Sequence, residues 1–314
     1  MSTLADSVEG IAHFIFDRVP DGLTTVAPKA RATNIWQQNG IPIVSKVKAI
    51  DNLESSIKTS LDLLGGLAKM GGPEDTIMVK PNFNSPDPYP GSTDLEFLRI
   101  VLNMLKATGA KIVVGESSGG MWRPTRKTVA KVELPRMLAA MGVELVMFDE
   151  YPRDWVQMEV GGEYLKELTM PRSAYEATKL VYIPCLKTHN LARFSLSLKL
   201  AVGFLHPGER RRLHVGSLER KLVEINLAWQ PDLIIMDGRK AFVTGGPDKG
   251  KLAEPGIIMA SGDMVAIDVE GLKVLLSYGE KNRLEPNPWD SGQIVTALKY
   301  GLGSGEGEYR LVGQ

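Results

Sequence analysis

The sequence predicts an α/β protein in which a mostly parallel sheet lies between two layers of helices. Apolar strands alternate with segments of helical periodicity along most of the chain. The strands are almost continuously apolar, which is typical of a sheet buried on both faces. No G-x-G-x-x-G sequence joins a strand to a helix. The expected class is therefore a three-layer, Rossmann-like fold without a dinucleotide fingerprint, so NAD is not expected as a cofactor.

The individual elements follow from local patterns. Runs rich in Val and Ile predict strands at 76–80, 111–115, 143–148, 179–184, 232–237 and 256–260. Apolar residues at helical spacing predict helices at 51–69, 94–107, 133–141, 217–228, 263–277 and 289–300. Asp263 is expected to cap the helix that follows it, because an Asp oxygen accepts from free amides of a first turn.

The chain divides into an N-terminal arm, residues 1–42, and an α/β domain, residues 43–314, which could form two lobes. The arm has few periodic apolar positions and several Pro and Gly residues, so it is expected to be extended after a short helix at 4–16. It could wrap the core or contact a second subunit, and a homo-oligomer formed through the arm is a possible consequence.

Composition narrows the function classes. Hydrophobic residues make up 43% of the 314 positions, and 37 basic residues balance 37 acidic ones. This balance argues against nucleic acid or an anionic membrane as a partner. The single cysteine, Cys185, cannot form an internal disulfide or supply a four-cysteine metal or iron-sulfur site. With no basic leader and no apolar run of about 18 residues, a cytoplasmic location is expected.

Polar residues follow most predicted strands, where ligands of open parallel sheets bind. These strand-end groups are Lys80-Pro81-Asn82, Glu116-Ser117-Ser118, Asp149-Glu150, Lys187-Thr188-His189-Asn190, Asp237-Gly238 and Ser261-Gly262-Asp263. Lys80 leaves its strand against a proline, which gives it a fixed exit direction that suits an anion. Glu116 and Asp149 could equally be surface carboxylates, and Asp237-Gly238 could simply be a turn.

The richest stretch, 187–214, contains three of the four histidines, His189, His206 and His214. Histidine exchanges protons near neutrality, while lysine and arginine hold carboxylate or phosphate groups. The alternative is a basic surface loop with one core histidine, and the run Arg210–Arg212 by itself is best explained as a solvated charge run.

One apparent nucleotide motif is discounted. The segment GGPDKGK at 245–251 fits the phosphate-loop pattern, but Leu252 follows the lysine and Pro255-Gly256 stand where a helix should begin. ATP is therefore not expected.

Several ordered motifs resemble the domain-of-unknown-function 362 family. They are VKPNF at 79–83, the segments at 91–118 and 184–204, and PDLIIMDGRKAFVTGGP at 231–247, so the resemblance covers roughly 75–270. Many relatives carry ferredoxin-type cysteine motifs. This chain lacks them, so the resemblance implies no iron-sulfur cluster here.

A second similarity concerns spacing. His189, Lys199 and His214 resemble the histidine, lysine and histidine set of the nickel-pincer lactate racemase family. That resemblance implies that Lys199 would tether the cofactor, His214 would bind nickel and His189 would move protons. The family's second catalytic histidine has no counterpart, since Glu116 or Ser117 stands near its expected place.

These patterns predict an enzyme that acts on a small anionic metabolite by acid/base chemistry of isomerase, lyase or hydrolase type. The expected catalytic residues are His189, Lys187 and Glu116, and the expected substrate-binding residues are Lys80, Asn82, Ser117, Asn190, Arg193 and Lys199. Two alternatives stay open. One is a non-catalytic protein that binds a carboxylate or phosphate, and the other is a metal- or nickel-pincer-dependent, racemase-like enzyme with His214, Asp149 and Asp237 near the metal.

Overall fold

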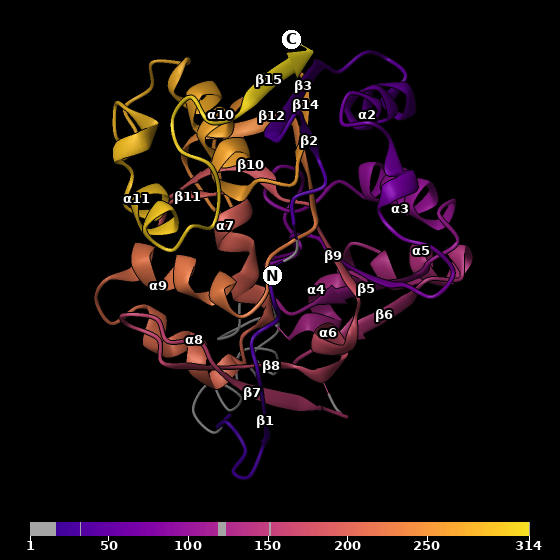
Figure 1. Cartoon of the computed structure of the whole chain (residues 1–314), viewed down its shortest axis with the longest axis vertical. Coiled ribbons are helices and arrows are strands. Elements are labelled where there is room, and N and C mark those ends of the chain that lie inside the picture. The colour runs from indigo at the N-terminus through magenta and orange to yellow at the C-terminus, as the bar shows by residue number, and fades with distance from the viewer. Residues whose placement is uncertain (1–16, 32, 119–123, 151, 314) are drawn as a thin grey trace.

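A computed structural model of the chain describes residues 17–31, 33–118, 124–150 and 152–313. Its main sheet lies between helices on two sides (Figure 1). The strands of this sheet, in spatial order, are β15 (Arg310–Gly313), β3 (Ile41–Lys48), β14 (Ile257–Ser261), β12 (Leu233–Gly245), β9 (Lys179–Tyr182), β4 (Thr76–Lys80), β5 (Lys111–Glu116) and β6 (Glu144–Met147). The α/β class expected from the sequence is confirmed.

The sheet is mostly parallel, as expected, but it is not purely so, because it contains two antiparallel pairs. Strands β12, β9, β4, β5 and β6 run parallel to one another. Strand β14, however, is antiparallel to both of its neighbours, β12 and β3. The reason is the short connection before β14. Strand β12 turns back in a hairpin with β13 (Gly250–Ala253), and β14 follows β13 after only a few residues. A strand parallel to β12 would need a longer crossover.

Alternate residues of the strands enter two different cores. Met78, Leu180 and Met236 pack in one cluster. Their chain neighbours Ile77, Val181 and Ile235 pack in the other. The near-continuous apolar strands are explained by this burial on both faces.

The helices separate between the two faces (Figure 1). One face carries α2 (Leu53–Asp62), α3 (Leu95–Lys106), α4 (Thr125–Lys131) and α5 (Leu134–Met141). The other carries α7 (Ser197–Leu200), α8 (Pro207–Leu213), α9 (Leu218–Glu224), α10 (Met264–Leu276) and α11 (Gly292–Lys299). Asp263 Oδ1 accepts from Ala266 N at 2.9 Å, so it caps α10 as expected.

Several predicted helices are shorter in the structure. The helix predicted at 51–69 stops at Asp62, because Gly65 and Gly66 adopt positive φ angles of 101° and 76°. A separate 3₁₀ turn, η1 (Leu67–Lys69), follows. The remaining 3₁₀ turns are η2 (Ala201–Phe204), η3 (Ile225–Leu227) and η4 (Pro288–Asp290).

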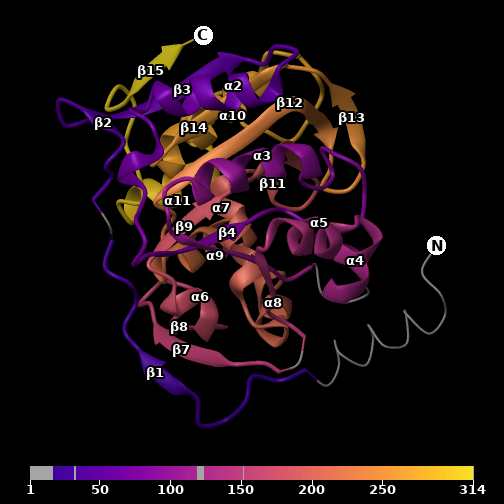
Figure 2. The same cartoon turned by 90° about the vertical axis from the view of Figure 1, so that its right-hand side faces the viewer.

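A second, three-stranded sheet lies at the end of the molecule opposite β15 (Figure 2). It consists of β1 (Thr24–Val26), β7 (Trp155–Glu159) and β8 (Glu167–Pro171), and α6 (Arg172–Glu176) follows it. The described part of the arm therefore packs on its own chain, since β1 pairs with β7 and the short strand β2 (Gln37–Gln38) pairs with β3. The helix predicted at 4–16 lies outside the described residues, and an oligomer formed through the arm stays a prediction.

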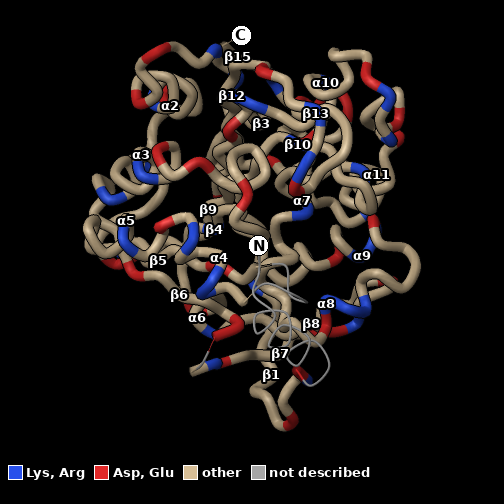
Figure 3. The backbone as a smooth tube through the Cα atoms, turned by 180° about the vertical axis from the view of Figure 1, so that it is seen from behind, with Lys and Arg blue, Asp and Glu red and all other residues tan. Residues whose placement is uncertain are grey.

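Two further features surround the strand ends. Strand β10 (Cys185–His189) forms a hairpin with β11 (Arg193–Ser195) and runs parallel to β12. The segment 245–251, which fits the phosphate-loop pattern, contains the hairpin turn between β12 and β13 (Gly250–Ala253). In the view from behind, the positions of Lys and Arg are interspersed with those of Asp and Glu along the described backbone (Figure 3).

Candidate functional site

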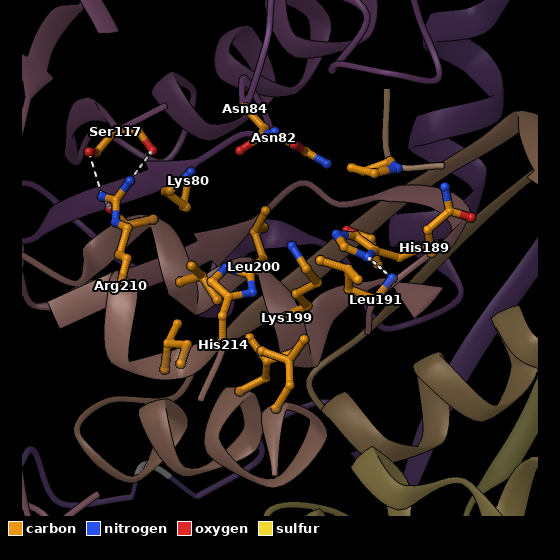
Figure 4. Close-up of a pocket in the computed structure, with 18 of the residues that line it drawn as sticks. Lys80, Asn82, Asn84, Ser117, His189, Leu191, Lys199, Leu200, Arg210 and His214 are labelled. Atoms are coloured by element: carbon orange, nitrogen blue, oxygen red, sulfur yellow. Dashed lines mark hydrogen bonds between the residues drawn. The ribbon is translucent and has the colours of Figure 1, made fainter. Parts of the chain in front are cut away.

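A pocket of about 490 Å³ opens at the carboxyl ends of β4, β5 and β10. Several sequence-predicted residues line it together, namely Lys80, Asn82, Glu116, Ser117, His189, Asn190, Lys199 and His214. Apolar side chains from α7, α8 and α9, including Leu200, Leu213 and Leu222, form the rest of the wall (Figure 4). The expected convergence of strand-end polar groups is therefore present for these residues.

Lys80 and Glu116 form a buried ion pair in the pocket wall. They end adjacent parallel strands, so their side chains leave the sheet side by side. Lys80 Nζ donates to Glu116 Oε1 at 2.5 Å and to the Pro81 carbonyl at 2.6 Å. Burial lowers the pKa of Lys80, and the charge of Glu116 opposes that shift.

Glu116 has both carboxylate oxygens occupied. Oε1 also accepts from Ser117 N at 2.8 Å, and Oε2 accepts from Phe83 N at 2.8 Å. These bonds join the loops that follow β4 and β5. Glu116 thus pairs with Lys80 and ties the two loops together in the pocket wall.

His189 reaches the pocket from the end of β10, with its orientation fixed by its own hairpin. Its Nδ1 accepts from Leu191 N and from Ala192 N, both at 3.1 Å. An Nδ1 that accepts two amide protons leaves the ring proton on Nε2. Burial, with the charges of Lys199 and Lys187 nearby, lowers the pKa of His189 to about 2.

This bonding changes the role expected for His189. The ring is neutral at physiological pH and its free lone pair is already used. His189 can donate a hydrogen bond from Nε2 to a ligand oxygen, but it is not arranged to accept a proton as a general base.

Within the described part of the chain, Lys199 is the pocket cation without a hydrogen-bond or ion-pair partner. It is half-buried on α7 and donates no hydrogen bond to any residue in the described parts of the chain. Figure 4 shows its side chain between His214 and His189. Burial and the charges of Lys187, Lys80 and Arg210 lower its pKa to about 8, and Asp248 opposes the shift.

Asp268 fixes the helix that carries Lys199. It lies in α10, and its carboxylate accepts from Ser197 N at 2.9 Å, from Leu198 N at 3.0 Å and from Ser197 Oγ at 2.6 Å. These are free amides of the first turn of α7, so Asp268 caps α7 from another helix. The sequence offered no signal for this contact, because the two segments are far apart along the chain.

Arg210 is a pocket residue that the sequence placed on the surface. It lies on α8, and its guanidinium donates to the carbonyls of Gly203, Leu205 and Ser118 and to Ser117 Oγ. It therefore joins α8 to the loop after β5 (Figure 4). Arg211 is half-buried and donates to the carbonyls of Gly208 and Asp17, and Arg212 is exposed as expected.

Four predicted site residues do not line the pocket, namely Lys187, Arg193, Asp237 and Asp149. Lys187 is buried and donates to the Gly91 carbonyl at 2.6 Å. Arg193 pairs with Glu219 at 3.2 Å, and its backbone has a positive φ of 69°. Asp237 lies inside the long strand β12, where Tyr89 and Arg239 donate to its carboxylate.

The predicted metal residues are not assembled. Asp149 is buried, which raises its pKa, and it is not among the pocket residues. His214 lies at the pocket edge and Asp237 lies in the sheet. Among the described residues, no three histidine, cysteine or acidic side chains lie close enough to hold a metal ion.

The histidine at 206 has a structural role. His206 Nδ1 accepts from Gly208 N at 3.1 Å, so it caps α8, and its ring packs edge-on against Trp155. Cys185 is also buried, and burial raises the pKa of its thiol to about 11. Such a thiol is unreactive at neutral pH.

The fold and the pocket define an α/β protein with a positively charged site at the carboxyl ends of its strands. Comparison with known families identifies the family of this protein. The family described as "Domain of unknown function (DUF362)" matches residues 77–273. This match covers more than half of the chain, and the chain belongs to that family, as the motifs at 79–83 and 184–204 had indicated.

Two individual proteins are similar to it. A "Thylakoid-associated protein sll1697" from Synechocystis is 27% identical over 230 residues, which cover 69% of this chain and 68% of that protein. The lactate racemase apoprotein from Thermoanaerobacterium thermosaccharolyticum matches with a TM-score of 0.45 and 13% identity, over 76% of this chain and 58% of the racemase. In the described part of this chain, no helix is both long and apolar enough to cross a membrane.

Proposed function

We propose that the protein is an enzyme that acts on a small carboxylate or phosphate metabolite by proton transfer. One observation carries the proposal. Lys199 presents an ammonium with no protein acceptor in the described chain to a pocket whose one lining carboxylate, Glu116, is already paired. A cation left in that state at a half-buried position favours an anionic ligand.

The charge balance of the lining supports an anion. Lys80, Lys199 and Arg210 face one carboxylate, Glu116, so the pocket carries net positive charge. The N–H groups of Arg210 donate to protein oxygens, so this residue contributes only its positive charge to the binding of a ligand. The donors that remain for a ligand include Lys199 Nζ, His189 Nε2 and the Asn82 amide.

The chemistry divides between two residues. With a pKa of about 8, Lys199 exchanges a proton close to neutral pH, as a general acid or base requires. His189 Nε2 donates to an oxygen on which negative charge develops. Isomerases and lyases of small carboxylates use this combination, while the absence of turnover would leave a binding protein for the same ligands.

A hydrogen–deuterium exchange assay tests the proposal without knowledge of the substrate. Small 2-hydroxy, 2-oxo and dicarboxylic acids are incubated with the protein in D₂O, and loss of C–H signals is followed by NMR. We expect faster exchange for at least one acid, abolished in Lys199→Gln and retained in Lys58→Gln, since Lys58 is exposed on α2. Saturable binding with no exchange of any acid would favour the binding protein instead.

A further inference from the structure

Three lysines lie at or beside the pocket, and their bonding differs. Lys80 donates to Glu116 and to the Pro81 carbonyl, and Lys187 donates to the Gly91 carbonyl. Lys199 has no such acceptor among the described residues, although α7 holds it rigidly through Asp268. A lysine used for structure is normally paired, so the two paired lysines have structural roles and Lys199 is left available.

We propose that Lys199 forms a covalent imine with the oxo group of a small oxo acid. This inference rests on the proposed function and narrows its substrate class, from any small anion to a carboxylate with an adjacent carbonyl. The unpaired amine faces a half-enclosed space of about 490 Å³, which accommodates an acid of a few carbon atoms beside it.

The surroundings favour the neutral amine that such a reaction needs. Burial removes water from the ammonium of Lys199 and is the main cause that lowers its pKa, and the positive charges of Lys187, Lys80 and Arg210 lower it further. The charge of Asp248 opposes the shift. The same positive charges attract the substrate carboxylate. The same surroundings therefore favour the neutral amine of Lys199 and raise the local concentration of the oxo acid. Catalytic lysines are activated by such surroundings.

The step balances without an additional reactant. Lys199 Nζ attacks the oxo carbon and forms a C–N bond, while the carbonyl oxygen takes up the two protons that the amine gives up and leaves as water. No electrons are gained or lost. Protonation of the imine then withdraws electrons from the neighbouring carbon, where a C–H proton passes to water or a carboxylate leaves as carbon dioxide. In either case the bonding electrons move into the iminium.

Other pocket residues are placed to contact the bound acid without reacting with it. His189 Nε2 and the Asn82 amide are free to donate to its carboxylate or to the departing oxygen. Leu200 and Leu213 form an apolar wall against which a short carbon chain packs. The pocket therefore provides separate places for the charged and uncharged ends of an oxo acid.

Reductive trapping tests the imine. Full-length protein is incubated with pyruvate and cyanoborohydride, digested, and analysed by mass spectrometry for the reduced adduct on each lysine. We expect the adduct on Lys199 at least tenfold above that on exposed Lys58, blocked by malonate and not formed with acetone, which lacks the carboxylate. Labelling of lysines in proportion to their exposure would overturn the inference.

Two further measurements test the imine independently of the amount of adduct. The rate of Lys199 labelling in the unmodified protein should rise with pH to a midpoint near 8, as its pKa requires, whereas exposed lysines should rise only near about 10. Purified protein that already carries a stable covalent group on Lys199 would contradict the proposal. If pyruvate leaves no adduct while malonate binds and a small acid still exchanges its C–H protons in D₂O, the imine fails and the proposed function stands. If malonate does not bind, no acid exchanges and pyruvate leaves no adduct, both fail.

Discussion

Lys80 and Glu116 meet at 2.5 Å across the ends of two parallel strands, with both side chains buried. The bond lies in the pocket wall and offsets the charge of Glu116, the only carboxylate among the described residues that line the pocket. Its consequence is that the pocket's remaining positive charge is concentrated on Lys199 and Arg210. The pair thereby determines both the stability and the electrostatics of the site.

Removing Lys80 alone should destabilise the protein strongly. Lys80→Met leaves the Glu116 carboxylate buried without its cation, which typically costs about 3–5 kcal/mol of unfolding free energy. Urea unfolding measures the loss. The double variant Lys80→Met with Glu116→Gln should recover a large part of it, and a double variant as unstable as the single one would contradict the account.

Arg210 and Arg212 form a matched pair for the role of the inward arginine. Arg210→Met removes hydrogen bonds from α8 to the loop after β5, so we expect a loss of about 3 kcal/mol. Arg212→Met, at an exposed position one half-turn on, should change stability by no more than roughly 0.5 kcal/mol. Equal effects of the two substitutions on the free energy of urea unfolding would disprove the role of Arg210 in joining α8 to the loop after β5.

Gly203 allows Lys80 to approach the backbone of η2. A Cβ at this position would lie 2.4 Å from Lys80 Cε, so Gly203→Ala must displace the lysine. We expect lower stability and weaker malonate binding. Gly72→Ala is the control, because no atom lies within 4 Å of the added carbon. If both alanine variants bind malonate like the parent protein, the Lys80 position does not matter to the pocket.

His189 should stay neutral well below pH 6. Its folded-state pKa of about 2 lies below the roughly 6.5 of an unfolded histidine, so the unfolded state binds more protons as pH falls. Its contribution to stability is therefore complete above about pH 6.5 and decreases below it. ¹⁵N NMR of the imidazole should show the Nε2–H form at pH 7 and at pH 5; a titration near pH 6.5 would refute this bonding pattern.

Parts of this site follow from the sequence, and others depend on contacts that no local pattern encodes. Lys80 and Glu116 follow apolar runs, so periodicity alone places them at one sheet edge. His189 was expected in the loop after the strand at 179–184, and in the structure it ends a further short strand, β10. Arg210 looked like one member of a solvated run, and its direction is set by α8 packing under the loop after β5. Asp237 looked like the end of a strand, but β12 continues through Gly238 because a bare backbone fits there against Ile257.

The central claim is that Lys199 makes this pocket an anion site. Calorimetric titration of the protein with malonate at low ionic strength, at pH 7 and at pH 9.5, tests it most directly. The account predicts saturable one-site binding at pH 7, weakening as Lys199 loses its proton above pH 8, and at least about tenfold weaker in Lys199→Gln, or ~1.4 kcal/mol. Malonate affinity that is equal in Lys199→Gln and unchanged between the two pH values would contradict it.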